Sequence, residues 1–161
     1  MDIQTVIIIA LFFLIFIVPF WLLVRAHKAK EKKFSHHFNE VGRQHQLQFT
    51  EQESWHGKAI GVDARHKKVL YLDNKLPQLG ELVIDLNQMS GCKLWKQGEV
   101  KQGLPARDSK IELRFTPKQI TNAAPALLFF DMNVDDPMQI NAAQERAKAW
   151  LQRIEVCMQQ A

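Results

Sequence analysis

Histidines and carboxylates are the side chains of this chain that could bind a metal ion, and three histidines lie close together in sequence. His36, His37 and His45 are not accompanied by an H-E-x-x-H motif or by a carboxylate cluster. On a helix, His37 and His45 are two turns apart and His36 faces elsewhere. We therefore expect surface or interfacial histidines and no metal site.

Residues 131–135, DMNVD, resemble the opening of a calcium loop because oxygen ligands occupy alternate positions. The sixth position is Asp136, where the turn needs a glycine, and the twelfth is Ala142, where a bidentate glutamate belongs. A strand end followed by a turn and a helix N-cap explains the same acids more simply. We expect that second arrangement.

Motifs for covalent or cofactor chemistry are missing from the sequence. It contains no G-x-S-x-G, no phosphate-cradling glycine run and no dinucleotide fingerprint. Ser54, Ser90 and Ser109 have no base at motif spacing, although a triad assembled in space leaves no trace in a sequence. We expect no enzyme and no cofactor, which leaves binding as the chemistry to look for.

Trp95 is the candidate for a protein contact. Alternation through CKLWK places Cys92 and Leu94 on one face of a strand and Lys93 and Trp95 on the other. If the first face is the core, Trp95 is exposed beside lysines, and exposed aromatic residues often mark contacts.

The first element along the chain is an apolar segment, residues 6–24, without a charged or amide side chain. At about 1.5 Å per residue a helix of this length spans the roughly 30 Å hydrocarbon core of a bilayer. It is apolar on every side, whereas a soluble core helix shows a polar face. Residues 1–25 are therefore predicted to be a transmembrane anchor.

Basic residues follow this segment, and the only charged residue before it is Asp2. A cleaved signal peptide has the reverse order, with positive charge before the apolar segment. By the positive-inside tendency we expect a single-pass membrane protein with its N-terminus outside and its C-terminal domain in the cytoplasm. The five basic residues that follow the apolar segment are called the basic flank: Arg25, Lys28, Lys30, Lys32 and Lys33.

The net charge of +4 comes mostly from the basic flank. Without the flank, Asp2 and Glu31, 16 basic and 15 acidic residues remain. Recognition of a duplex requires a concentrated basic face, so we expect no nucleic-acid partner. The flank can also attract anionic lipid headgroups.

Residues 26–46 are predicted to form a basic juxtamembrane helix, because Phe34, Phe38, Val41 and His45 recur at helical spacing. Whether this helix is free, embedded in the membrane surface or packed on the following domain stays open. The remaining residues, 47–161, suffice for one compact domain. Cys92 and Cys157 are far apart in sequence and are expected to be reduced thiols.

Within this domain the sequence predicts six or seven short antiparallel strands and then a helix. Residues 80–86 and 110–116 alternate apolar and polar side chains, and the short connection after KAIGV predicts a hairpin with KVLYLD. After Asp136 and Pro137, an apolar face containing Trp150 predicts a helix that packs on the sheet. The predicted class is α+β or mainly β.

The order of WHGKAIGVDARHKKVLYLD, LVIDLNQMSGCKLWK and NAAQERAKAWLQRI behind a membrane anchor resembles small bacterial pleckstrin-homology-like proteins. The resemblance implies a bent antiparallel sheet or barrel of about seven strands, capped by one C-terminal helix. It also implies a binding or assembly module of the bacterial inner membrane.

Lipid-reading members of that superfamily carry basic residues between their first two strands. The matching residues here are Arg65, His66, Lys67 and Lys68, which we call the basic turn. A solvated hairpin turn explains the same residues. The expected function is a membrane-anchored scaffold that contacts a protein partner or a second copy, and the alternative is a sensor of anionic lipid headgroups.

Overall fold

The computed structural model describes residues 31–75, 80–98, 100–101, 104–105, 109–119 and 124–159. The chain divides into two compact units, Met1–Val41 and Gly42–Ala161. The predicted anchor and Arg25, Lys28 and Lys30 of the basic flank lie outside the described residues. In the described part of the chain, no helix is both long enough and apolar enough to cross a membrane.

Residues 31–44 are helical, as the spacing of apolar residues predicted. Phe38 and Val41 are buried, Phe34 is half-buried, and His45 follows the helix as an exposed residue. Gly42 has a packing reason to be glycine. A Cβ atom there would lie 2.5 Å from Cε2 of Phe49, so a larger residue would require the Phe49 ring to move.

The first sheet consists of β1 (Glu51–Trp55), β2 (Lys58–Asp63), β3 (Lys68–Asp73) and β4 (Glu81–Asp85), antiparallel and in that order. The predicted hairpin is confirmed as β2 and β3, which are buried along almost their whole length. In β4, Ile84 is buried and Leu82 is half-buried, in line with the predicted alternation.

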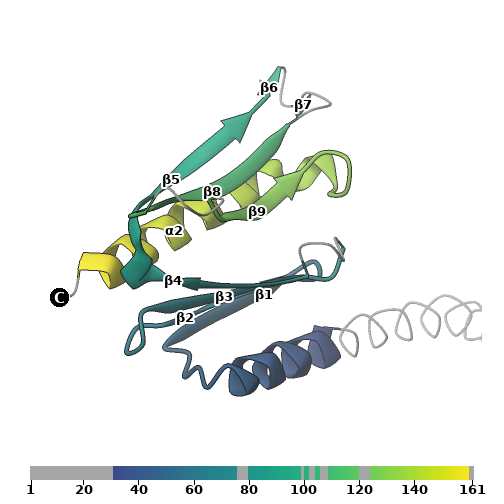
Figure 1. Ribbon diagram of the computed structural model, residues 1–161. Coiled ribbons are helices and arrows are strands. Elements are labelled where there is room, and N and C mark those ends of the chain that lie inside the picture. The colour runs from purple at the N-terminus through teal and green to yellow at the C-terminus, as the bar shows by residue number, and fades with distance from the viewer. Residues whose placement is uncertain are drawn as a thin grey trace, which may run out of the picture. The chain divides into compact units, whose positions relative to one another are not determined.

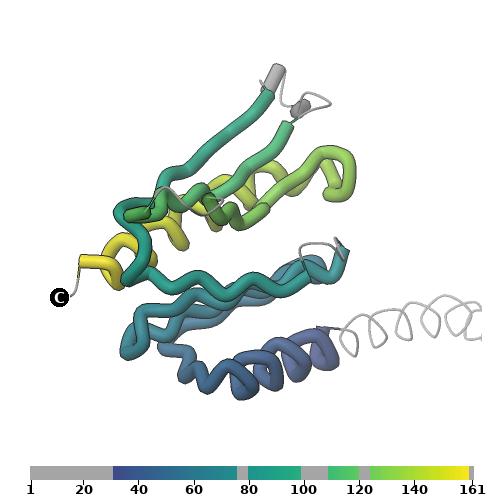
Figure 2. Tube along the Cα trace, viewed as in Figure 1, coloured from purple at the N-terminus to yellow at the C-terminus, as the bar shows by residue number. Residues whose placement is uncertain are grey.

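The second sheet consists of β5 (Met89–Gln97), β8 (Lys110–Pro117) and β9 (Ala126–Asp131), with β8 in the middle. The chain passes from the first sheet to the second through η2 (Leu86–Gln88), as Figure 2 shows. The predicted alternation in β8 is confirmed, since Ile111, Leu113 and Phe115 are buried. Two short strands, β6 (Val100–Lys101) and β7 (Leu104–Pro105), pair with each other.

The last helix is α2 (Ile140–Gln159), preceded by η3 (Pro137–Gln139). The Asp136 side chain caps η3 by accepting a hydrogen bond from the Met138 backbone N–H at 3.0 Å, as its position before Pro137 predicted. α2 packs on β5, β8 and β9 of the second sheet (Figure 1). Trp150 is fully buried, as expected of a helix that packs on the sheet.

Side chains from both sheets and from α2 form one hydrophobic core. The predicted α+β class, with antiparallel strands followed by a C-terminal helix, is confirmed. The strands form two larger sheets of four and three strands and a separate two-stranded pair. The polar strand β1 and the short strands β6 and β7 were not singled out in the sequence. Main contributors to the core are Ile60, Val69, Leu113, Phe115, Leu127, Trp150 and Ile154.

Candidate functional site

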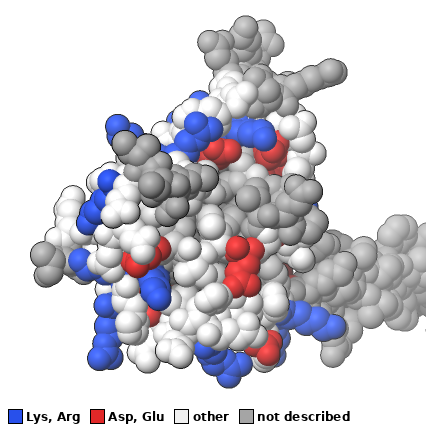
Figure 3. Space-filling view, viewed as in Figure 1, with Lys and Arg blue, Asp and Glu red and all other residues white. Residues whose placement is uncertain are grey.

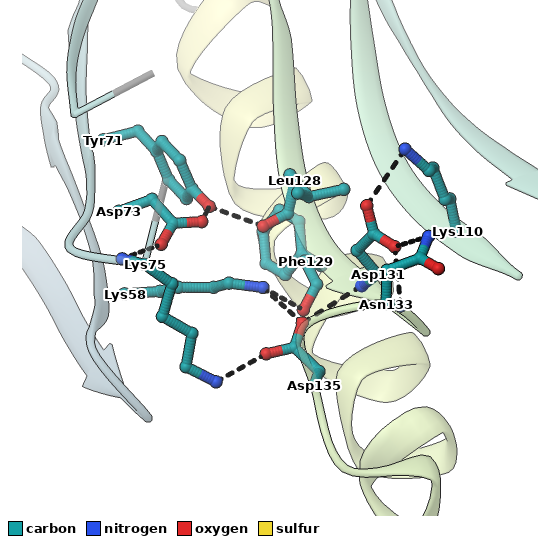
Figure 4. Close-up of polar contacts among 10 residues, drawn as sticks. All are labelled: Lys58, Tyr71, Asp73, Lys75, Lys110, Leu128, Phe129, Asp131, Asn133 and Asp135. Carbon is teal, nitrogen blue, oxygen red and sulfur yellow. Dashed lines mark hydrogen bonds and ion pairs between the residues drawn. The ribbon is translucent and has the colours of Figure 1, made fainter. Parts of the chain in front are cut away.

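A buried group of charged side chains connects the two sheets (Figure 4). Lys58, the first residue of β2, is only 1% exposed, and its Nζ atom lies 2.6 Å from Oδ2 of Asp135. Lys75 contacts the other oxygen of Asp135 at 2.7 Å, and the Asp131 backbone N–H donates to Asp135 at 3.0 Å. Asp135 is therefore held by two lysines and one amide, one of the lysines coming from a strand of the first sheet.

Tyr71 of β3 makes a second connection, because its hydroxyl donates to the Leu128 backbone oxygen of β9. Asp73 lies beside this hydroxyl at 3.3 Å. Asp131 is paired with Lys110 at 2.9 Å and accepts two hydrogen bonds from Asn133. The acids of residues 131–135 thus face lysines and amides, and β9 ends at Asp131 as the strand-end interpretation predicted.

The electrostatics of this network keep Asp135 charged and Tyr71 neutral. Burial raises the pKa of Asp135, but hydrogen bonds from Lys58 and Lys75 lower it more, so the pKa lies below its ordinary value. Burial raises the pKa of the Tyr71 hydroxyl far above its ordinary value, with Asp73 adding to the effect. A carboxylate kept charged between lysines and a phenol kept neutral are suited to joining two sheets.

The three histidines considered above as metal ligands do not form a metal-binding group with other described residues. His36 and His37 are exposed on the helix of residues 31–44, and His45 contacts Glu81 at the start of β4. Among the residues that the structure describes, no three His, Cys, Asp or Glu side chains are placed to hold a metal ion. Cys92 and Cys157 are both free and buried.

A surface hollow of about 480 Å³ lies beside η2 and the loop that follows β8. The described residues that line it have amide, proline and methionine side chains, with Lys118 as the one charged residue among them. Their amide groups could form hydrogen bonds with a bound molecule.

Strand β5 is an edge of the second sheet, with β8 on one side (Figure 1). Cys92 is buried and Leu94 is half-buried, whereas Lys93 is exposed and Trp95 is half-buried. The register with β8 places Cys92 and Leu94 opposite buried residues and Trp95 opposite Glu112 on the other face, as predicted, but Trp95 is half-buried like Leu94 rather than exposed. The Arg114 guanidinium explains the difference, because it lies 3.4 Å from the centre of the Trp95 ring.

Arg114 is itself held in place by Glu112, whose Oε2 atom lies 2.9 Å from Arg114 Nε. Lys93 and Lys96 are exposed on the same strand as Trp95, and neither forms an ion pair with any residue in the described ranges. Among the described residues, the outer face of β5 and β8 thus combines the Trp95 ring with two cations, Lys93 and Arg114, and one acid, Glu112, while Lys96 lies on the other face.

The basic turn connects β2 to β3, and this corrects one expectation. Because β1 precedes β2, the connection between the first two strands is His56 and Gly57, so residues 65–68 do not occupy the position that the resemblance implied. Arg65 and His66 are exposed, but His66 Nδ1 lies 2.7 Å from Oδ2 of the buried Asp63. Asp63 also accepts hydrogen bonds from the backbone N–H groups of Gln48 and His66.

Charges are mixed over the face of the molecule seen in Figure 3, where small groups of basic and acidic side chains of the described residues alternate. Lys32 and Lys33 of the basic flank are exposed on the helix of residues 31–44. The absence of a nucleic-acid partner stays a prediction.

Comparisons of the chain with models of known protein families, with curated proteins and with solved structures gave no match.

Sequence reasoning missed the network around Asp135. One signal could have pointed to it, because Lys58 opens an otherwise apolar strand sequence, KAIGV, and a lysine in such a place needs an acidic partner. The partner is 77 positions further along the chain, and no local pattern connects the two residues.

Proposed function

We propose that this protein is a membrane-anchored binding module that contacts another protein through the second sheet of its folded unit. The observation that carries the proposal is the nine-residue strand β5, which lies at a sheet edge and presents Trp95 beside Lys93 and Lys96, both exposed and without an ion pair to any described residue. An edge strand offers backbone hydrogen-bonding groups, and an aromatic side chain next to it offers contact area.

The proposal places the protein in the bacterial inner membrane, with one span in residues 1–25, the N-terminus outside and the folded unit in the cytoplasm. The apolar segment and the basic flank support this topology. Sheets of four and three strands followed by α2 support a pleckstrin-homology-like fold. A tether to the membrane raises the effective concentration of the module near any partner in the same membrane.

A second function, contact with anionic lipid headgroups, is favoured by the exposure of Arg65 and His66 in the basic turn. Together with the basic flank, this turn would add charge attraction to the inner leaflet at about 1 kcal/mol per close basic residue. His66 is already engaged with Asp63, which leaves Arg65, Lys67 and Lys68 for this role.

The test of the leading proposal is the size of the complex that the full chain forms in its native membranes, measured by native electrophoresis after mild solubilisation. We expect a complex larger than one chain, which Trp95→Ala reduces to the free chain. Met138→Ala is the matched control, since Met138 is an apolar side chain that is 90% exposed elsewhere on the unit. The proposal would be contradicted if the unmodified chain migrates as a single free chain, or if it forms a complex that both variants leave intact.

For the lipid alternative, the measurement is accessibility of the folded unit to protease in nanodiscs with neutral or anionic lipid at low and physiological salt. Protection that needs anionic lipid and is lost in Arg65→Glu/Lys67→Glu/Lys68→Glu would support a lipid role. Equal accessibility in both lipids would exclude it.

A further inference from the structure

The outer edge of β5 is open where a further strand would lie. β5 is the first strand in the order β5-β8-β9 and makes no pairing beyond β8 among the described residues. Ser90, Lys93 and Lys96 along the strand are exposed, so β5 is accessible to a neighbour.

The charged side chains of β5 have a defined spacing. Lys93 lies opposite Arg114 on the outer face of the sheet, and Lys96 lies opposite Ile111 on the other face. Leu94 and Trp95 stand between the two lysines, and both are half-buried. A strand added alongside would meet a cation, two apolar residues and a second cation in turn.

Arg114 adds a second positive charge to the outer face, opposite Lys93. Its guanidinium lies over the Trp95 ring and pairs with Glu112, the one acid of this face among the described residues, so the excess positive charge along β5 is that of Lys93 and Lys96. Opposite charges on paired strands stabilise the pair, and like charges destabilise it. The charge of β5 and its neighbours therefore favours an acidic strand.

The same lysines disfavour a second copy of this chain as the added strand. In the two-fold antiparallel pairing that sets Leu94 opposite Trp95, Lys93 of each copy would lie opposite Lys96 of the other. Lysines on edge strands commonly prevent such self-pairing.

We propose that β5 binds an extended acidic segment of a partner protein as a fourth strand of the second sheet. The segment has the pattern acid, apolar, apolar, acid, because acidic side chains three residues apart fall opposite Lys93 and Lys96, and the two residues between them fall opposite Leu94 and Trp95. The inference rests on the proposed function and names the chemistry of the partner at the same surface.

The test uses the full chain in nanodiscs of neutral phosphatidylcholine and a fluorescent peptide, TVEVIEVT, which has the proposed pattern. Its controls, TVQVIQVT and TVKVIKVT, change only the two acids. We expect the glutamate peptide to bind at least about tenfold more tightly than the glutamine peptide, measured by fluorescence polarisation.

The variant Lys93→Glu/Lys96→Glu should reverse the preference, so that the lysine peptide binds best. Lys67→Glu/Lys68→Glu makes the same charge change on the basic turn and should leave the original preference intact. Both pairs of substitutions are at residues outside the buried core, so the reversal can be separated from a loss of folding.

Equal binding of the three peptides, or no binding of any, would overturn the acidic-segment proposal. Dimers of the full chain that dissociate in Lys93→Glu/Lys96→Glu, or peptide binding that depends on lipid composition, would overturn it in favour of a second copy or a lipid surface. If the peptides fail but Trp95→Ala still disrupts a complex in native membranes, the proposed function stands without this partner chemistry. If both fail, neither stands.

Discussion

Lys58 is a charged residue at the start of an apolar strand, and its contact with Asp135 connects β2 to the turn after β9. Lys75 contacts the same carboxylate from a position where 32% of its side chain is exposed. Water screens the second pair more than the first. The two lysines on one acid should therefore differ in their effect on stability.

We expect Lys58→Met to lower the free energy of unfolding by about 3 kcal/mol, because it leaves Asp135 buried with a weaker partner. Lys75→Met is the control and should cost less than about 1 kcal/mol. The double variant Lys58→Met/Asp135→Leu should recover most of the loss. Urea unfolding followed by tryptophan fluorescence measures all three, and equal losses for the two lysines would refute the ranking.

Cys92 gives a second prediction at this scale. Burial raises the pKa of its thiol to about 12, with the Glu155 charge adding to the effect. At pH 8 the reactive thiolate is then on the order of 1,000-fold scarcer than for a free cysteine. Iodoacetamide should label Cys92 slowly in the folded protein and rapidly in urea, as read by mass spectrometry of the peptide. Rapid labelling of the folded protein would show that this strand is not packed as described.

At the scale of elements, α2 is bound to β1 by a network around Glu53. Arg146 Nε lies 2.7 Å from Glu53 Oε1, and Trp150 Nε1 donates to Oε2 at 2.8 Å. Arg153 and Glu51 form a more exposed pair at 2.9 Å between the same two elements. The polar side chains of β1 thus place a helix whose apolar face packs on the second sheet.

Glu53→Gln should lower the free energy of unfolding by about 1 kcal/mol, because an amide cannot accept both hydrogen bonds as a charged group does. Glu51→Gln makes the same change in the exposed pair and should cost less than about 0.5 kcal/mol. Urea midpoints compare the two variants. A larger effect at Glu51 would show that the outer pair holds the helix.

The elements that the sequence predicted well are those with a local period. β4, β8 and α2 each bury one face, and their apolar residues recur every two residues or along one helical side. β1 has the sequence EQESW, which shows no apolar alternation, and it was not predicted. Its Glu53 contacts residues of α2 that lie 93 and 97 positions further along the chain. Contacts at that separation have no local pattern.

The candidate site was predicted only in part. Alternation placed Trp95 on the outer face of its strand, but not Arg114 over its ring, since that contact joins two strands. The basic turn was found as a hairpin yet assigned to the wrong pair of strands, because the polar β1 before it was not recognised. The position of Trp95 at a sheet edge follows from strand order, which the sequence leaves open.

At the scale of the whole molecule, four carboxylates among the described residues have pKa values below their ordinary range: Glu53, Asp63, Asp131 and Asp135. In each case burial raises the pKa, and hydrogen bonds and nearby cations lower it more. A carboxylate with a lowered folded pKa contributes stability that is complete above its unfolded pKa and is lost as the pH falls through the folded value.

The contribution of these carboxylates to the free energy of unfolding should therefore be constant above about pH 5 and fall progressively below about pH 4. Asp135→Asn should start from a lower stability and show a shallower decline in acid. Urea unfolding at a series of pH values measures both slopes. Parallel curves for the two proteins would mean that Asp135 does not contribute to the acid sensitivity.

The central claim, that the edge strand β5 binds a protein, is tested most directly by photocrosslinking in intact cells. A photoreactive amino acid is placed at Ser90 or Gln97 on β5, and at Arg65 or Lys67 on the basic turn, in the full chain. We predict protein adducts from both β5 positions that disappear with Trp95→Ala, and no protein adduct from the basic turn. Adducts confined to the basic turn, whether with protein or with lipid, would contradict the account.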